Sequence, residues 1–179
     1  TSNDAVASVS STGLVTSVAD GSATITATSG EASATATTTV GQVAAAVSLS
    51  DSILTLASLT DTTQLTATVS DANGQVIDGA TVTWTTSNDA VATVSSMGLV
   101  TAVADGSATI TATSGSASAT ATTTVSQAAS SITLSPTSLS FASVNDTTTL
   151  VPTVKDANNN TIDGATVTWA TSSSSVATV

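Results

Sequence analysis

The sequence predicts an all-β protein made of tandem antiparallel β-sandwiches. Apolar residues alternate with Thr and Ser along many short stretches, β-branched residues are abundant, and the pattern returns with a repeat period of 85 residues. Alternation with a period of two places apolar side chains on one face of a strand and polar side chains on the other. Hydrophobic residues make up 40% of the chain but aromatic residues only 2%, so we expect a core of mostly small aliphatic side chains.

Internal repetition sets the expected domain organisation. Thr1–Val9 returns as Thr86–Val94 and, more loosely, as Thr171–Val179. An offset of 85 residues exceeds a solenoid unit of roughly 20–50 residues and suits a whole small sandwich. Small residues near 41–46 and 126–131 mark the boundaries. We expect the C-terminal half of a repeat at residues 1–42, a complete repeat at 43–127 and the N-terminal half of a third at 128–179.

The strands of residues 43–127 are predicted from alternating apolar positions, with Trp84 as the one large core side chain. Residues 99–103 are apolar on both faces, so their inward register stays open. The other expected inward positions follow in chain order: Val47, Leu49, Leu54, Leu56, Leu65, Ala67, Val69, Val82, Ala92, Val94, Ala108, Ile110, Ala112, Ala117, Ala119, Ala121 and Val125. This gives seven to eight short strands.

Turn residues separate these strands. Asp71–Gly74, Gly79, Ser95–Gly98 and Ser114–Gly115 each combine glycine with small polar residues, a composition typical of turns. Asp-Gly at residues 105–106 predicts a tight hairpin between the flanking strands.

Four motifs resemble the bacterial Ig-like domain, group 2, the Big2 type found in invasin- and intimin-like adhesins. They are Trp84–Ser87, Val91–Val94, Gly98–Thr101 and Gly106–Ile110. Residues 1–42 carry the last three, and residues 128–179 carry Trp169 and Val176–Val179. The resemblance implies immunoglobulin-like sandwiches, a surface or secreted location, a spacer or adhesive role, and no catalytic residues. Asn158-Asn159 replaces Asn73-Gly74, which leaves the geometry of that turn open.

Composition argues against several classes of function. The net charge is −11 with a single basic residue, Lys155, so the chain cannot neutralise a nucleic-acid backbone. The chain has no run of 18 apolar residues, so we expect no membrane insertion in this segment. It also has no His, Cys or Tyr. A catalytic triad cannot be drawn, and we predict no enzyme activity, no catalytic residues and no cofactor.

Two groups of oxygen-bearing side chains are candidate metal ligands: Asp71, Asn73 and Asp78, and the equivalent Asp156, Asn158 and Asp163. Oxygen-rich loops can hold calcium, but no Glu closes these loops as in an EF-hand. Asp and Asn also form turns by accepting hydrogen bonds from their own backbone. We favour that interpretation and predict no metal, while calcium binding stays open.

The expected function is structural: a repeat segment of a long extracellular stalk, fibre or adhesin shaft that continues through both ends. The expected partners are neighbouring copies of the array, joined end to end, with lateral association open. Residues 1–42 are expected to complete their sandwich with residues 130–179 of a neighbouring copy. The alternatives are an adhesin module that binds a host ligand or carbohydrate, and an Ig-like decoration or tail domain of a phage virion. Trp84, Trp169 and Phe141 occupy predicted core positions, which argues against an aromatic binding platform.

Overall fold

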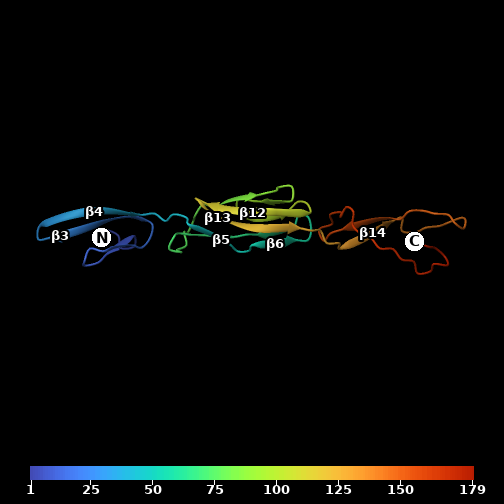
Figure 1. The fold of residues 1–179 in the computed structure, drawn as a ribbon, viewed down its shortest axis with the longest axis horizontal. Coiled ribbons are helices and arrows are strands. Elements are labelled where there is room, and N and C mark those ends of the chain that lie inside the picture. Colours follow the sequence, from blue (N-terminus) through green and yellow to red (C-terminus); the bar gives the residue numbers. More distant parts are fainter. The chain divides into compact units, whose positions relative to one another are not determined.

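The computed structural model describes residues 1–179, and all its regular elements are strands (Figure 1). The strands are β1 (Ala7–Val9), β2 (Val15–Ser17), β3 (Gly21–Ser29), β4 (Ala32–Val40), β5 (Ala46–Leu49), β6 (Ile53–Leu56), β7 (Thr62–Gln64), β8 (Ala67–Ser70), β9 (Thr83–Thr86), β10 (Ala92–Val94), β11 (Leu99–Ala102), β12 (Gly106–Ser114), β13 (Ala117–Val125), β14 (Ser131–Ser135) and β15 (Val151–Lys155). No helix is present that could cross a membrane.

The chain forms two compact units. One contains Thr1–Val47, Thr68–Thr81 and Ser114–Ala117; the other contains Ser48–Ala67, Val82–Thr113 and Ser118–Val179. We call residues 1–42 the first segment, 43–127 the central segment and 128–179 the last segment, after the sequence repeat.

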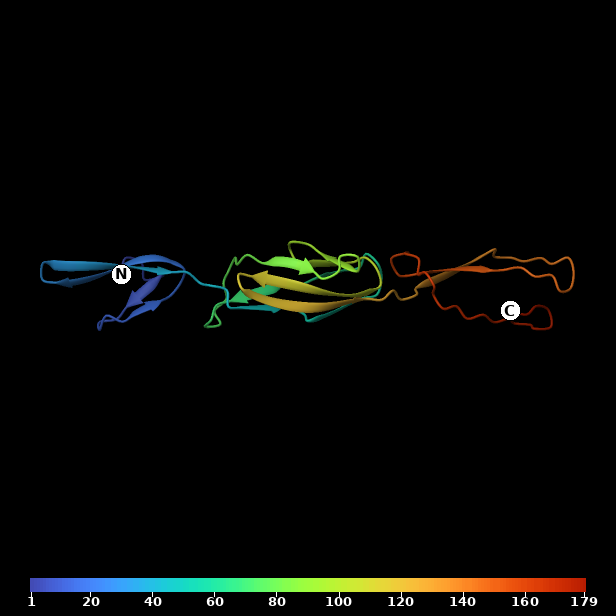
Figure 2. The ribbon, with the colours of Figure 1, turned by 45° about the horizontal axis from the view of Figure 1, so that its top comes forward.

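The central segment contains a four-stranded sheet in the order β6-β13-β12-β9 and a three-stranded sheet in the order β10-β11-β7. Strands β12 and β13 lie side by side in both views (Figures 1 and 2). A third pairing joins β5 to β8. One pair departs from the antiparallel prediction, because β6 runs parallel to β13, with Ile53 opposite Thr122. The chain crosses from the β5–β8 sheet to β13 between Leu49 and Ile53, and this crossing sets the direction of β6.

The hairpin predicted at Asp105-Gly106 is wrong. Strand β11 lies in the three-stranded sheet and β12 in the four-stranded sheet, so these residues cross between sheets and do not join hydrogen-bonded neighbours. The crossing explains the glycine, because Gly106 has a φ of 146° and a Cβ there would lie 2.9 Å from a methyl group of Val91.

The core of the central segment contains many of the predicted inward residues, whereas Val47, Val82 and Ala119 are only partly buried and lie outside it. Leu54, Leu56, Leu65 and Ile110 are each at most 5% exposed, and Trp84 packs against them while only partly buried. The open register of residues 99–103 is also settled: Val100 and Ala102 point inward, at 0% and 2% exposed, while Leu99 and Val103 point outward. Alternation thus identifies the inner face, as expected for a two-layer sandwich.

The first segment has only a small core. Its strands pair as β1-β2 and β3-β4, and the buried apolar residues are Val6, Ala7 and Ala23, with Val40 packed against them. Figure 2 shows β3–β4 (blue) as a two-stranded ribbon. Leu14 and Val15 are 69% and 43% exposed.

The last segment contains a single antiparallel pair, β14–β15, with Leu134 opposite Pro152 in an unbroken register. Pro152 therefore lies in a two-stranded ladder without a bulge. Trp169 and Phe141, predicted as core residues, are 41% and 45% exposed. Their counterparts in the central segment, Trp84 and Leu56, pack in the core cluster that includes Ala92, Ile110 and Val125.

Candidate functional site

The most deeply buried charged group of the chain is Asp156, which directly follows β15 and is only 2% exposed. Its Oδ1 accepts hydrogen bonds from the backbone N–H groups of Asn158 at 3.0 Å and Asn160 at 2.8 Å. These bonds close a turn in which a carboxylate takes the place of a backbone carbonyl. One carboxylate oxygen is thereby committed to the local turn, and the other is free to accept hydrogen bonds from elsewhere.

The second oxygen, Oδ2, accepts two hydrogen bonds from the central segment. The donors are the backbone N–H of Leu59 at 2.9 Å and Nε2 of Gln127 at 3.0 Å. Nδ2 of Asn158 donates in the reverse direction, to the carbonyl of Leu59 and to Oδ1 of Asp61, both at 2.9 Å. We call Leu59, Asp61, Gln127, Asp156, Asn158 and Asn160 the Asp156 cluster.

The central segment holds its side of this cluster in place. Leu59 packs against the hydrophobic core, and Ser58 N–H donates to Oδ2 of Asp61 at 3.0 Å, which closes the loop around Thr60. The backbone N–H of Gln127 donates to Oδ1 of Asp105 at 2.8 Å. Asp105, at the crossing between the sheets, therefore anchors the start of the chain that leads into the last segment.

The hydrogen bonds decide the charge state of Asp156. Burial alone raises the pKa of a carboxyl group, but hydrogen bonds from Gln127, Asn160 and the Leu59 N–H stabilise the ionised form. Together they lower the pKa of Asp156 from 3.8 to about 2. The cluster thus holds an ionised carboxylate at neutral pH.

A related cluster surrounds Asp71, 85 residues earlier. Its Oδ1 accepts from the N–H groups of Asn73 and Gln75, both at 2.9 Å, and its Oδ2 accepts from Nε2 of Gln42 at 3.2 Å. The Gln42 hydrogen bond is the largest cause of a lowered pKa of Asp71. We call these four residues the Asp71 cluster. It has the turn and the glutamine of the Asp156 cluster, but no loop equivalent to Leu59–Asp61 docks on it.

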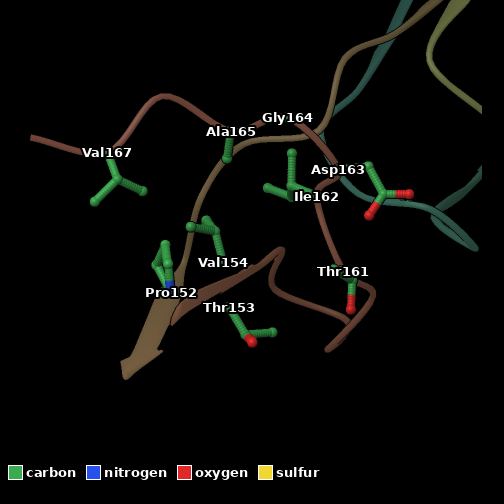
Figure 3. Close-up of a pocket in the computed structure, with 9 residues that line it drawn as sticks. All are labelled: Pro152, Thr153, Val154, Thr161, Ile162, Asp163, Gly164, Ala165 and Val167. Atoms are coloured by element: carbon green, nitrogen blue, oxygen red, sulfur yellow. The ribbon is translucent and has the colours of Figure 1, made fainter. Parts of the chain in front are cut away.

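The candidate calcium ligands differ in their surroundings. Asp71 and Asp156 accept hydrogen bonds from their own turns, while Asp163 is exposed and its carboxylate points away from the neighbouring side chains in Figure 3. No group of three or more His, Cys, Asp or Glu residues is arranged to hold a metal ion. Asn159 takes the position of Gly74 in the second turn. The backbone is left-handed at both positions, with a φ of 79° at Gly74 and 65° at Asn159.

An open depression of about 250 Å³ lies in the last segment (Figure 3). Val154 on β15 and the facing residues Ile162, Ala165 and Val167 direct apolar side chains into it. Thr153, Thr161 and Asp163 also line it, so the depression is partly polar.

Sequence reasoning singled out Asp156 and Asn158 but missed Gln127, Asp105, Leu59 and Asn160. Two of these left a signal in the sequence. Gln42 and Gln127, and likewise Asp20 and Asp105, recur at the repeat offset, and the bond from Gln42 N–H to Oδ1 of Asp20 is 2.8 Å, like that of the later pair. Polar residues that recur beside a repeat boundary could have indicated the site.

The sequence matches the family described as bacterial Ig-like domain (group 2), over residues 1–40 and 43–125. The chain belongs to this family. Membership in the bacterial Ig-like family agrees with the β-sheet architecture and indicates a surface structural or adhesion-type module of a cell-surface or extracellular protein. The matched ranges leave out the last segment.

Solved structures of a surface layer protein, SbsC, are similar to the chain. SbsC domains 1–6 match with a TM-score of 0.47 and 23% identity, over 88% of this chain and 22% of that one. The crystal structure of rSbsC(31–844) gives a TM-score of 0.46, 23% identity, and coverage of 89% and 23%. SbsC domains 4 and 5 give 0.45, 26% identity, and coverage of 69% and 67%. The chain thus spans less than a quarter of the longer SbsC structures. Comparison with curated proteins gave no match.

Proposed function

We infer that this chain is a structural segment of the shaft of a long bacterial extracellular protein, such as a stalk, a fibre or an adhesin shaft. The observation that carries the proposal is the Asp156 cluster, in which a 2% exposed carboxylate accepts hydrogen bonds from Leu59 and Gln127 of the preceding segment. Charged groups are buried where their hydrogen bonds are satisfied, and such bonds fix geometry. A flexible tether would not need this cluster. A shaft of defined spacing would.

The position of the chain in its native assembly tests the shaft role. Antibodies raised against the central segment, coupled to gold, are applied to the native surface and observed by electron microscopy. A shaft segment gives label along projections, between their base and their tip. Label confined to the tips would favour an adhesin module that binds a ligand, and absence of surface label would contradict the proposal.

Replacement of Asp156 tests the cluster directly. In Asp156→Ala the Leu59 N–H and the Gln127 amide lose their acceptor, so we expect faster amide exchange at Leu59 and a broader distance distribution between spin labels at exposed positions 118 and 168. Asp163→Ala is the matched control, since Asp163 is exposed in the same segment. An unchanged distribution in Asp156→Ala would show that the cluster does not hold the two segments.

The lowered pKa of Asp156 sets the pH window of this effect. Because the folded pKa of about 2 lies below the ordinary 3.8, the ionised carboxylate stabilises the cluster fully above about pH 3.8. The stabilisation declines as the pH falls and is lost through about pH 2. Amide exchange at Leu59, corrected for intrinsic rates, should show this transition. Protection that is constant down to pH 2 would contradict it.

A further inference from the structure

The outer face of the four-stranded sheet in the central segment is made almost wholly of threonine. Ile110 and Ala112 on β12 are 0% exposed, so the residues that alternate with them point to the other side of the sheet. The same alternation holds on β6, β9 and β13. Apart from Ile53, the outward side chains of these four strands are all threonine or serine. We call this surface the threonine face.

The threonine face is complete within the chain. Strands β12 and β13 lie in the middle of the sheet (Figure 1), and β9 and β6 flank them on either side. Thr111 lies opposite Thr85, and Thr124 lies opposite Thr55. All its outward residues fall in one compact unit, and the core covers its inner side. The exposure of Thr55, Thr120, Thr122 and Thr124 therefore belongs to the finished sandwich.

Charge indicates what kind of partner fits this face. The chain has twelve acidic residues and a net charge of −11, yet all twelve lie outside the strands. Two copies therefore repel each other at their turns and can approach where the surface is neutral. A basic partner would bind the acidic turns instead. The uncharged face thus favours a second copy of the chain over a charged partner.

The chemistry of the face is complementary to itself. A threonine hydroxyl both donates and accepts hydrogen bonds, so two identical faces can satisfy each other, directly or through water. Ile53, opposite Thr122 in the ladder, adds a large apolar side chain that is 73% exposed. Exposed charges commonly keep β-sheets from associating, and the four strands carry none.

The area of the face sets the strength of the contact. Strands β12 and β13 have nine residues each, and β6 and β9 have four. At about 3.4 Å per residue and about 4.8 Å between strands, the face covers about 400 Å². Two such faces bury about 800 Å², less than the roughly 1,200–2,000 Å² of a stable interface. One repeat therefore pairs weakly, and several repeats in series reach a stable interface.

The sequence supplies further faces of the same kind. Thr24 and Thr26 on β3 lie opposite Thr37 and Thr35 on β4, and all four recur on β12 and β13 at the repeat offset. Each added repeat therefore adds another neutral face, and the weak contacts of a long array act together.

We propose that the threonine face of one copy packs against the threonine face of a second copy, so that the chains associate side by side. Both copies use the same surface, so the contact has a two-fold axis. Twisted sheets pack face to face with their strands about 30° apart. Thr111 and Thr120, near the middle of the face, then lie close to the axis. The inference deepens the proposed shaft function and rests on it, since it names the lateral partner of the shaft.

A single cysteine in the full chain tests the contact, because the chain has no cysteine of its own. Thr120→Cys, treated with a short bis-maleimide, should give crosslinked dimers whose yield grows with concentration. Thr93→Cys is the matched control, since Thr93 is exposed on β10 in the other sheet. Contacts between chain ends do not bring two copies of residue 120 together. Absence of dimers at position 120, or an equal or larger yield at position 93, would overturn the proposal.

Charge reversal at the face tests self-recognition. With Thr122→Cys as the crosslinking reporter, Thr120→Glu alone and Thr120→Lys alone should each lose dimers, because like charges meet at the axis. A mixture of the two should regain them. Thr93→Glu makes the same change in net charge on the other sheet and should leave the yield intact. Circular dichroism verifies the β-structure of each variant, and a mixture that stays monomeric would overturn the proposal.

Repeat number tests the argument from area. A second copy of residues 43–127, inserted after residue 127, keeps the repeat in phase and adds one face. The concentration that gives half-maximal crosslinking at position 120 should then fall by about tenfold or more. An unchanged concentration would overturn the proposal. If position 120 fails to crosslink while gold label lies along native projections, the shaft function stands and this inference falls. Crosslinks without surface label would support the pairing and contradict the shaft.

Discussion

Two hairpins of this protein, at residues 21–40 and 106–125, have the same sequence except that Glu31 is replaced by Ser116. Both form two strands of the same bounds within the repeat. Their burial differs: Ile110 is 0% exposed whereas Ile25 is only partly buried. Alternation therefore encodes the strands and the hairpin locally. Whether one face becomes a core is decided by strands that come from elsewhere in the chain.

The largest difference between the hairpins is expected from removing the isoleucine. Ile110→Ala should lower the free energy of unfolding of the central segment by about 2–5 kcal/mol, because it leaves a cavity in a packed core. Ile25→Ala should cost well under half of that, because its site is still partly open to water. Urea denaturation in dilute solution, followed by the fluorescence of Trp84, measures the first, and far-UV circular dichroism measures the second. Equal losses would mean that the two hairpins are packed alike.

Replacing Gly98, before β11, or Gly13, before β2, by alanine should lower the free energy of unfolding by a smaller amount, and the two losses should differ. Gly98→Ala and Gly13→Ala both place alanine in the left-handed region, at about 1–2 kcal/mol. Only Gly98→Ala also forces atoms against the Leu65 carbonyl and the Trp84 ring, which adds about 1–3 kcal/mol. Thermal unfolding of the two variants in dilute solution should show a lower melting temperature for Gly98→Ala than for Gly13→Ala. A reversed order would refute the geometry at Gly98.

The smallest effect should have the opposite sign. Thr123 is 0% exposed and its hydroxyl oxygen has no hydrogen-bond partner. Thr123→Val removes a buried unsatisfied hydroxyl and should stabilise the central segment by about 1 kcal/mol. The equivalent Thr38 is only partly buried, so Thr38→Val should change stability by less than about 0.5 kcal/mol. Chemical denaturation can resolve the difference, and a destabilised Thr123→Val would indicate that the hydroxyl is hydrogen bonded.

The inner face of the central segment could be predicted from the sequence. Period-two alternation identified Leu54, Leu56 and Ile110, because one face of each strand must leave water. The register of residues 99–103 could not be predicted, because both faces are apolar and only the burial of Val100 and Ala102 in the core cluster distinguishes them.

Local turn signals were less informative than the sheets to which they connect. Asp105-Gly106 has the composition of a hairpin, but the same backbone requirement arises where a chain crosses between sheets. The parallel direction of β6 has a similar origin, since it depends on a crossing and leaves no mark in a two-residue period.

The Asp156 cluster could be predicted only in part. Asp156 and Asn158 stood out as polar residues in a recurring turn. Their partner at Leu59 could not be found, because it contributes backbone atoms 97 residues away in the sequence. The identity of residue 59 does not indicate where its backbone N–H points.

The parallel pair of β6 and β13 has a mechanical consequence. Hydrogen bonds join Thr122 N–H to Ser52 and Ser126 N–H to Leu56, and Ala128 N–H continues the series to Ala57. Tension applied at the two ends of the central segment pulls β6 toward its N-terminal end and β13 toward its C-terminal end. Because the two strands are parallel, these forces act in opposite directions along the strands. These bonds are then sheared together and are not peeled apart one at a time. The strand pair that departs from the antiparallel rule is therefore the element that resists stretching of the chain.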